Sequence, residues 1–250
     1  MISKTAFRIE ILLLIIYSLL TTRCEEREDV PTIDDTVLQR SDLGSSGLGN
    51  IWVLGDSWSA CHGDNTWRRT LYQKLEASGY TFDFIGTETD IDPPCEAGQE
   101  FDRDHNAYGG ITASDLLKSL PDWYKQLPPA DHVLLMAGGN DLAGDEITFV
   151  SQTLIDIVAS LRSNNPNVIV FMGAYAYTLG AEAAFVDEGN RVISDLADAI
   201  STTQSPVYYA DLRPNFDPSI HELADEHPNA DGMAVLGDNW FAKIQEVSGQ

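Results

Sequence analysis

The sequence predicts one α/β domain: a three-layer α/β/α sandwich around a doubly wound, mostly five-stranded parallel sheet. From residue 49 onward, short apolar runs alternate with longer amphipathic segments, which is the pattern of a parallel sheet flanked by helices. Neither an internal repeat nor a break in composition marks a second domain in this stretch. The chain has 250 residues, of which 43% are apolar, and this is enough for one substantial core.

Five runs are predicted as strands because each is short, apolar and bounded by turn-forming residues. These runs are Ile51–Leu54, Thr81–Ile85, His132–Met136, Val168–Met172 and Val207–Ala210. Helices are predicted between them, where apolar residues recur at spacings of three and four. The predicted helices cover 66–78, the segment carrying Ile147, Val150, Leu154, Ile157, Val158 and Leu161, then 184–200, and a last helix after Asn229 with Met233, Leu236, Trp240 and Ile244 as its buried stripe.

The N-terminal residues are typical of an exported protein. Residues 1–24 carry Lys4 and Arg8 and then an apolar run over 11–20, which predicts a signal peptide. This run is about half of the roughly 20 apolar residues that a spanning helix needs, so we expect no transmembrane anchor after processing and a secreted or periplasmic location. Lipidation of Cys24, which would anchor the protein at the cell envelope, is the alternative, although Thr22 and Arg23 are poor for a lipoprotein cleavage site. Residues 25–48, charged and then Ser/Gly-rich, are predicted to be a flexible linker, which leaves 49–250 as the folded domain.

Charge and cysteine content restrict the partners and the compartment. The formal net charge of -24 repels phosphate backbones, so nucleic acid is excluded as a partner, whereas neutral polysaccharide is unaffected by such a field. In the predicted domain only Cys61 and Cys95 are present. An exported domain can oxidise such a pair, so we expect a disulfide, with two free thiols as the alternative.

Three short motifs carry the predicted chemistry: Gly55-Asp56-Ser57, Gly138–Asp141 and His227–Asn229. Ser57 and Asn140 follow predicted strands, and ligands of open parallel sheets gather outside the carboxyl ends of the strands. A serine hydroxyl becomes nucleophilic when a neighbouring imidazole removes its proton, and an amide donor can stabilise the oxyanion that forms. The three motifs together therefore predict a serine esterase site.

These motifs resemble those of the SGNH/GDSL hydrolase superfamily, and the resemblance spans nearly all of residues 49–250. The closer similarity is to carbohydrate esterase family three, whose members include acetylxylan esterases. It is carried by LGDS at 54–57, TWRRTL at 66–71, GYTFDFIG at 79–86 and HNAYGG at 105–110. The resemblance implies a flavodoxin-like fold and removal of O-acetyl groups from plant polysaccharide without a metal or cofactor.

The resemblance also implies roles for individual residues. Ser57 takes the position of the nucleophile and His227 that of the general base, while the Ser57 and Gly110 amides and the Asn140 side chain form the oxyanion hole. The family's acid stands three residues before the histidine, where this chain has Ala224; Asp225, two residues before His227, is the predicted third catalytic residue. A backbone carbonyl, a water or Asp217 are the alternatives.

Further positions have two interpretations each. Trp58 beside the nucleophile and Tyr108 in the predicted oxyanion loop can face a sugar ring or simply pack. Asp90, Asp92, Asp102, Asp104 and His105 could hold calcium, but no EF-hand loop or zinc-binding helix motif is present, so no metal is expected to take part in catalysis.

The predicted function is an exported serine esterase that acts on acylated carbohydrate or small esters. The alternatives are a lipase, thioesterase or arylesterase of the same superfamily, and a catalytically silent carbohydrate-binding module. The Asp-x-His spacing at 225–227 is the feature that favours the silent module.

Overall fold

A computed structural model describes residues 47–63, 65–90, 95, 100–141, 147–175 and 183–249. The predictions for the signal peptide, for Cys24, for most of the linker and for Asp92 lie outside these residues. The described strands are β1 (Gly47–Gly55), β2 (Thr81–Ile85), β3 (Asn106–Ala107), β4 (His132–Met136), β5 (Ile169–Gly173) and β6 (Val207–Ala210). They form one sheet in the order β2-β1-β4-β5-β6, with β3 pairing against the end of β1, and every pairing is parallel.

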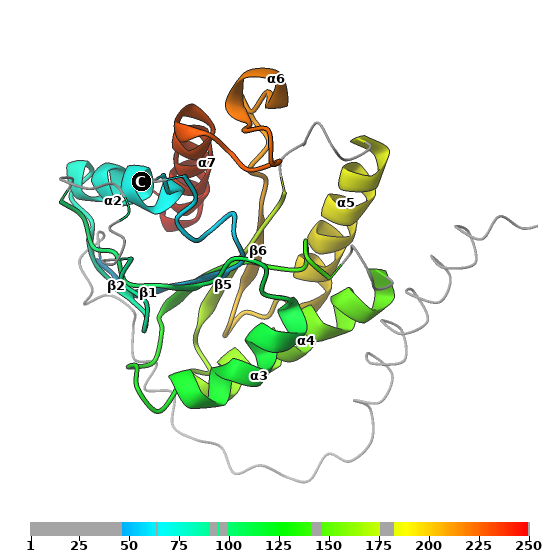
Figure 1. The fold of residues 1–250 in the computed structure, drawn as a ribbon. Coiled ribbons are helices and arrows are strands. Elements are labelled where there is room, and N and C mark those ends of the chain that lie inside the picture. Colours follow the sequence, from blue (N-terminus) through cyan, green and yellow to red (C-terminus); the bar gives the residue numbers. More distant parts are fainter. Residues whose placement is uncertain are drawn as a thin grey trace, which may run out of the picture. The chain divides into compact units, whose positions relative to one another are not determined.

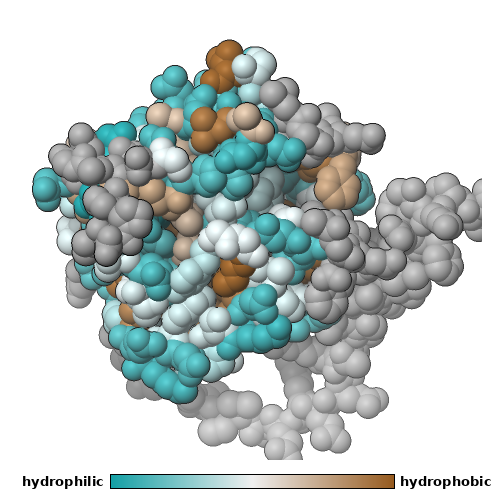
Figure 2. Space-filling model, in the orientation of Figure 1, coloured by the Kyte–Doolittle hydropathy of each residue, from teal (hydrophilic) through white to brown (hydrophobic). Residues whose placement is uncertain are grey.

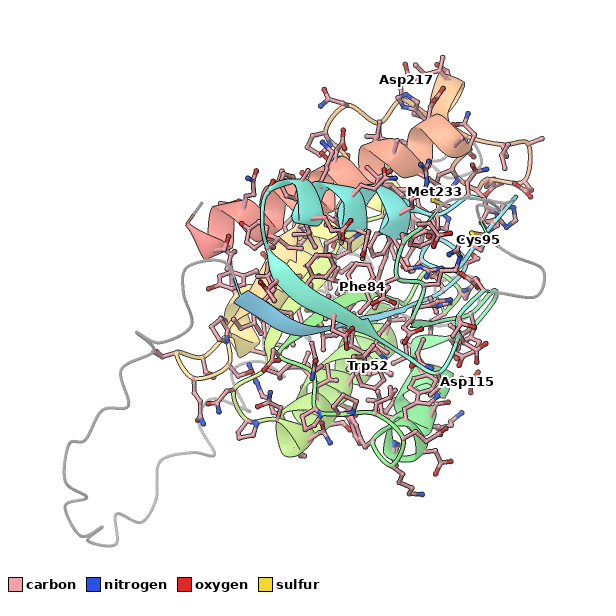
Figure 3. The ribbon with its side chains drawn as sticks, turned by 90° about the vertical axis from the view of Figure 1, so that its left-hand side faces the viewer. Trp52, Phe84, Cys95, Asp115, Asp217 and Met233 are labelled. Carbon is pink, nitrogen blue, oxygen red and sulfur yellow. A yellow bond between two sulfur atoms is a disulfide. The ribbon has the colours of Figure 1, made fainter. Side chains whose placement is uncertain are left out.

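Helices cover both faces of this sheet, so the predicted α/β/α sandwich is confirmed (Figure 1). The described helices are α2 (Trp67–Ala77), α3 (Ala113–Trp123), α4 (Ile147–Asn164), α5 (Ala183–Ile200), α6 (Pro218–His221) and α7 (Ala230–Ser248). Helices α2 and α7 cover one face, and α3, α4 and α5 cover the other. A hydrophobic core lies on each face of the sheet, and alternating side chains of β1 point into one or the other. Trp52 packs on the α3 side, whereas Ile51 packs with Phe84 and Met233 on the α7 side (Figure 3).

The predicted elements agree with the structure except at a few positions. Strand β1 begins at Gly47, four residues before the predicted start, and strand β5 begins one residue later than predicted. Strand β3 and helices α3 and α6 were not predicted. Helix α3 begins after Thr112, whose hydroxyl accepts from the Asp115 amide at 3.1 Å, a normal N-terminal cap, and it buries Leu116 and Leu120 against the sheet.

The surface agrees with the acidic, polar composition. The face seen in Figure 2 is mostly hydrophilic, with apolar side chains near α6, where Ile220 is 63% and Leu223 is 37% exposed. None of the described helices is both long and apolar enough to cross a membrane.

Candidate active site

The topology brings two of the predicted motifs together. Strands β1 and β4 are neighbours in the sheet, with Gly55 paired to Met136 at their carboxyl ends. The chain runs outward from β1 to β2 and then returns to the other side of β1 as β4, which makes this edge the topological switch point where ligands of such sheets bind. Ser57 and Asn140 are on the loops that leave these two strands.

Ser57 lies on a tight turn that only glycine at position 55 allows. A Cβ on Gly55 would lie 2.5 Å from Ser59 Oγ and 2.8 Å from the Met136 carbonyl oxygen. The turn is closed by the amides of Ser59 and Ala60, which donate to the Asp56 carbonyl at 3.0 and 2.9 Å. This rigid turn leaves the Ser57 side chain half-buried at the pocket.

His227 reaches Ser57 from the loop before α7. Its Nε2 lies 2.8 Å from Ser57 Oγ, which is hydrogen-bond distance. The His227 carbonyl accepts from the Leu223 amide at 2.7 Å, and Asn229 caps α7 through the Gly232 amide at 2.9 Å. The loop and the following helix therefore fix the imidazole, and Ser57 Oγ can donate its proton directly to Nε2.

Asp225 contacts His227 in a different way from the prediction. The Asp225 backbone carbonyl lies 2.9 Å from His227 Nδ1, whereas its carboxylate Oδ1 is 3.5 Å away, longer than a normal hydrogen bond. With Asp225 only two residues before His227 and Glu226 at a left-handed φ of 66°, the chain turns so that the carbonyl, not the carboxylate, faces Nδ1. Of the alternatives, the structure therefore favours the backbone carbonyl.

Asp217 does not take this role. Its carboxylate accepts from the amide and hydroxyl of Ser219 at 2.9 and 2.7 Å and caps α6. The Asp225 carboxylate itself binds a residue that the sequence did not single out, since its Oδ2 lies 2.9 Å from Nε2 of His62.

The predicted oxyanion donors lie on loops that contact one another. The Asn140 side-chain amide donates one hydrogen to the Ile111 carbonyl at 2.9 Å, which ties the loop after β4 to the loop that holds Gly110. Within the described part of the chain, no acceptor contacts its second hydrogen, which leaves that hydrogen for a ligand. Among the described residues, the backbone N–H groups of Ser57 and Gly110 have no acceptor, so all three predicted donors have capacity for an oxyanion.

Behind Ser57, a buried carboxyl group links the first two motifs. Asp56 accepts from the Trp58 amide at 3.0 Å and from the Tyr175 hydroxyl, and the Tyr175 oxygen in turn accepts from the Gly139 amide at 3.1 Å. Burial raises the pKa of Asp56 from 3.8 to about 6, and the hydrogen bonds from Tyr175 and Trp58 offset only part of this effect. Asp56 and Tyr175 therefore form a buried support beneath the nucleophile turn.

We predict a pH-dependent stability from this group. Because the pKa of Asp56 is higher in the folded than in the unfolded chain, its contribution to the free energy of unfolding is fully present below pH 3.8 and is lost as the pH rises to about 6. The expected loss is roughly 3 kcal/mol. Urea unfolding of Asp56→Asn and of the wild type should therefore diverge between pH 4 and 7, in favour of the variant. Profiles that stay parallel across this range, with or without a constant offset from the altered hydrogen bonds, would contradict the raised pKa of Asp56.

The two predicted aromatic residues lie in different surroundings. Trp58 lines the pocket and packs edge-on against Tyr175, with ring centres 5.9 Å apart. Tyr108 does not line this pocket: it stacks on Trp123 at 5.9 Å, and its hydroxyl donates to Glu88 at 3.0 Å. The structure therefore brings Trp58 to the site and uses Tyr108 for packing.

The pocket itself has a cavity of about 300 Å³ next to Ser57, Asn140 and His227. Its far wall is apolar and comes from α4 and α5, through Val150, Leu154, Val186, Val192 and Ile193. Gly138 allows α4 to approach, since its φ is +113° and a Cβ there would lie 2.8 Å from Val150.

A disulfide joins Cys61 and Cys95, as predicted. It attaches the loop after Ser57 to Cys95, 34 residues further along the chain. Two of the carboxylates considered for calcium have other partners: Asp90 pairs with Arg68 and with His105, and Asp102 accepts from the Phe84 amide at 2.9 Å.

One group within the described residues could offer three ligand atoms to a metal: His62, Asp225 and His227, with those atoms within 4.8 Å of one another. The rings of His62 and His227 are stacked, however, with centres 3.8 Å apart and planes 12° from parallel. Imidazole nitrogens bind a metal in the plane of the ring, so one ion cannot lie in both planes. The stacking suits a direct contact between the rings better than a shared ion.

Sequence reasoning missed His62 and Tyr175. The contact from His62 to Asp225 spans 163 residues and that from Tyr175 to Asp56 spans 119, so no local spacing could reveal them. A signal was present for His62 only: it follows the nucleophile motif closely and adjoins a cysteine of the predicted disulfide.

Comparison with known proteins agrees with this geometry. The model of the GDSL-like Lipase/Acylhydrolase family matches residues 53–235, a range that contains every residue of the site. The chain belongs to this family. It is therefore a carboxylic ester hydrolase, as the three motifs predicted. No curated protein sequence matches the chain.

Similar solved structures support the same fold. A carbohydrate esterase family 3 protein from Talaromyces cellulolyticus and an acetyl esterase with an acetate ion each have a TM-score of 0.71 and 24% identity, covering 80% of this chain and 98% of the other. A family 3 carbohydrate esterase from Clostridium thermocellum has a TM-score of 0.67 at 21% identity, covering 82% and 98%. At these identities the likeness establishes the fold.

Proposed function

We propose that this protein is an exported serine esterase that removes acetyl or other short acyl groups from carbohydrate through an acyl-enzyme. The observation that carries the proposal is the 2.8 Å contact between Ser57 Oγ and His227 Nε2 at the switch point of the sheet. A base at hydrogen-bond distance from a serine hydroxyl is the arrangement that makes the hydroxyl a nucleophile.

In the proposed reaction, Ser57 Oγ attacks the ester carbonyl carbon while its proton moves to His227 Nε2. The Asp225 carbonyl accepts the hydrogen on Nδ1, which fixes the tautomer and steadies the imidazolium. The amides of Ser57 and Gly110 and the side chain of Asn140 stabilise the oxyanion. When the C–O bond breaks, the imidazolium returns the proton to the leaving alcohol; water then attacks the acyl-serine by the same route and releases the carboxylic acid.

The carbohydrate substrate is supported by the family 3 carbohydrate esterases among the similar structures and by the acetyl esterase that holds acetate. Export is supported by the sequence of residues 1–24 and by the disulfide, because disulfides persist in oxidising compartments. Lipidation at Cys24 belongs to the same proposal as an alternative form of export.

The proposal is tested by measuring acetate release from acetylated xylan, acetylated mannan, chitin fragments and simple acetyl esters, with Ser57→Ala as the control. Release from at least one acetylated polysaccharide that depends on Ser57 is the expected result. Acetate release from simple esters alone would contradict the carbohydrate substrate and would still support an esterase activity.

A second candidate, a lipase, thioesterase or arylesterase, is favoured by the cavity. Its volume of about 300 Å³ is far larger than an acetyl group and lies within the usual range for small-molecule pockets. Its apolar wall between α4 and α5 would suit a longer acyl chain, because burial of each methylene contributes about 0.8 kcal/mol.

Acyl chain length separates the two candidates. On p-nitrophenyl esters the proposed function predicts that kcat/KM is highest from acetyl to butyryl and falls beyond, whereas the second candidate predicts a gain of about 0.8 kcal/mol for each methylene that the apolar wall buries. Ile193→Phe, which narrows the cavity, should then leave acetate release nearly unchanged. A maximum at longer chains that is lost in Ile193→Phe would instead establish the second candidate.

A further inference from the structure

His62 packs directly on the proposed catalytic base. Its imidazole stacks on that of His227, with ring centres 3.8 Å apart and planes 12° from parallel. Both rings are partly buried, with side chains 29% and 22% exposed. A flat ring against His227 restricts rotation of the base away from Ser57, because turning its plane would require His62 to move.

His62 also binds the carboxylate of Asp225, the residue that the sequence predicts as the partner of His227. Its Nε2 lies 2.9 Å from Asp225 Oδ2, and this hydrogen bond is the main reason why the pKa of Asp225 is lowered. The Asp225 side chain is otherwise 57% exposed. With its carboxylate fixed by His62, Asp225 presents its carbonyl to His227 Nδ1 at 2.9 Å.

The support under His62 is firm. Its backbone exchanges two hydrogen bonds with Asn65, both of 3.0 Å, and the neighbouring Cys61 is joined covalently to Cys95. The loop that carries Asp225 is closed by the Leu223 amide, which donates to the His227 carbonyl at 2.7 Å, but residues 223–226 are all exposed and Glu226 takes a left-handed φ. His62 is thus the anchored partner, and the 225–227 loop is the partner that it holds.

We infer that His62 is a positioning residue for this esterase, which fixes the His227 imidazole by stacking on its face and by holding the Asp225 carboxylate. The inference rests on the proposed roles of Ser57 and His227. This role of His62 replaces the Asp-x-x-His arrangement, which the chain lacks. The Asp225 carboxylate then acts on His227 through His62 and the loop backbone, not through a direct bond to Nδ1. His62 itself touches no reacting atom.

The test is steady-state kinetics on p-nitrophenyl acetate with variants that separate the two contacts. His62→Ala removes both, and we expect kcat to fall roughly 10- to 100-fold with little change in KM, since small misplacements of a catalytic group have effects of this size. His62→Gln keeps a donor for Asp225, and His62→Phe keeps the stacked ring; both should fall between the wild type and His62→Ala. Asn65→Ala is the matched control, because it removes only the side-chain hydrogen bond to the Gly63 carbonyl and keeps the two backbone hydrogen bonds that hold His62, so kcat should stay near that of the wild type.

A double-mutant cycle with Asp225→Ala tests the coupling. If His62 acts partly through the carboxylate, its replacement should cost less in the Asp225→Ala background than in the wild type. The rate of Ser57 labelling by a fluorophosphonate should fall in parallel with kcat.

Unchanged kcat in His62→Ala, a rise in KM alone, or strict additivity with Asp225→Ala would overturn the inference. All three leave the proposed function intact, provided that Ser57→Ala is inactive. A wild-type protein that neither turns over ester nor labels at Ser57 would overturn the proposed function, and this inference with it.

Discussion

Replacing Ser57 by alanine is expected to reduce ester hydrolysis roughly 10⁴- to 10⁶-fold while the fold is kept. The hydroxyl is the only group that the change removes, and its oxygen lies 2.8 Å from His227 Nε2. The turn is held by Gly55, by the Asp56 carbonyl and by the sheet, none of which depends on Ser57 Oγ. Initial rates on p-nitrophenyl acetate, with circular dichroism and thermal unfolding as checks on folding, measure the effect.

His227→Ala is the matched variant for this prediction. Groups that act as one unit are strongly non-additive, so the double variant should be no slower than either single one. Covalent labelling by a fluorophosphonate should occur in the wild type and be absent in Ser57→Ala. A folded wild-type protein that does not label would favour the catalytically silent module, and a Ser57→Ala variant that retains most of its activity would remove Ser57 from the reaction.

The inner strands were predictable because the middle of a parallel sheet is buried on both faces, so that these strands are largely apolar runs. His132–Met136 matches β4 at both ends. The start of β1 was not predictable, since Gly47–Asn50 has little intrinsic preference for a strand. It is held there by pairing with β2 and by the Asn50 amide, which donates to the Asp131 carboxylate at 2.8 Å.

Helix α3 was missed for a local reason. Pro121 lies inside it, and proline is normally a signal that a helix ends. Here the proline falls in the last turn, where burial of Leu116, Leu120 and Trp123 against the sheet outweighs the lost hydrogen bond. The buried residues Ala113, Leu116, Leu120 and Trp123 do recur at the helical spacings of three and four, so the segment carried a helix signal that the proline obscured.

The site was predictable where function depends on local backbone geometry, and not where it depends on contacts between distant loops. Gly55, Ser57 and Asn140 follow directly from the turns that leave β1 and β4. The partner of His227 Nδ1 depends on how the 223–227 loop folds, and spacing alone could not decide between the carboxylate and the carbonyl of Asp225. His62 and Tyr175 reach the site only through the tertiary fold.

Replacing Asn140 by alanine is expected to lower kcat by about 10²- to 10³-fold, the usual effect of removing one oxyanion donor. The Asn140 amide already gives one hydrogen to the Ile111 carbonyl at 2.9 Å, so its orientation is fixed before substrate binds, and the second hydrogen meets the charge as it develops. Because this bond forms mainly in the transition state, KM should change little. Steady-state rates on p-nitrophenyl acetate measure both constants.

Asn140→Asp separates the effect of losing the hydrogen-bond donor from the effect of changing the size of the side chain. It keeps the size of the side chain but replaces the donor by an oxygen that repels the oxyanion and loses the bond to Ile111. Its kcat should therefore be as low as that of Asn140→Ala, or lower. An aspartate variant close to the wild type, or an alanine variant in which only KM rises, would mean that Asn140 binds the ground state and that the amides of Ser57 and Gly110 hold the oxyanion without it.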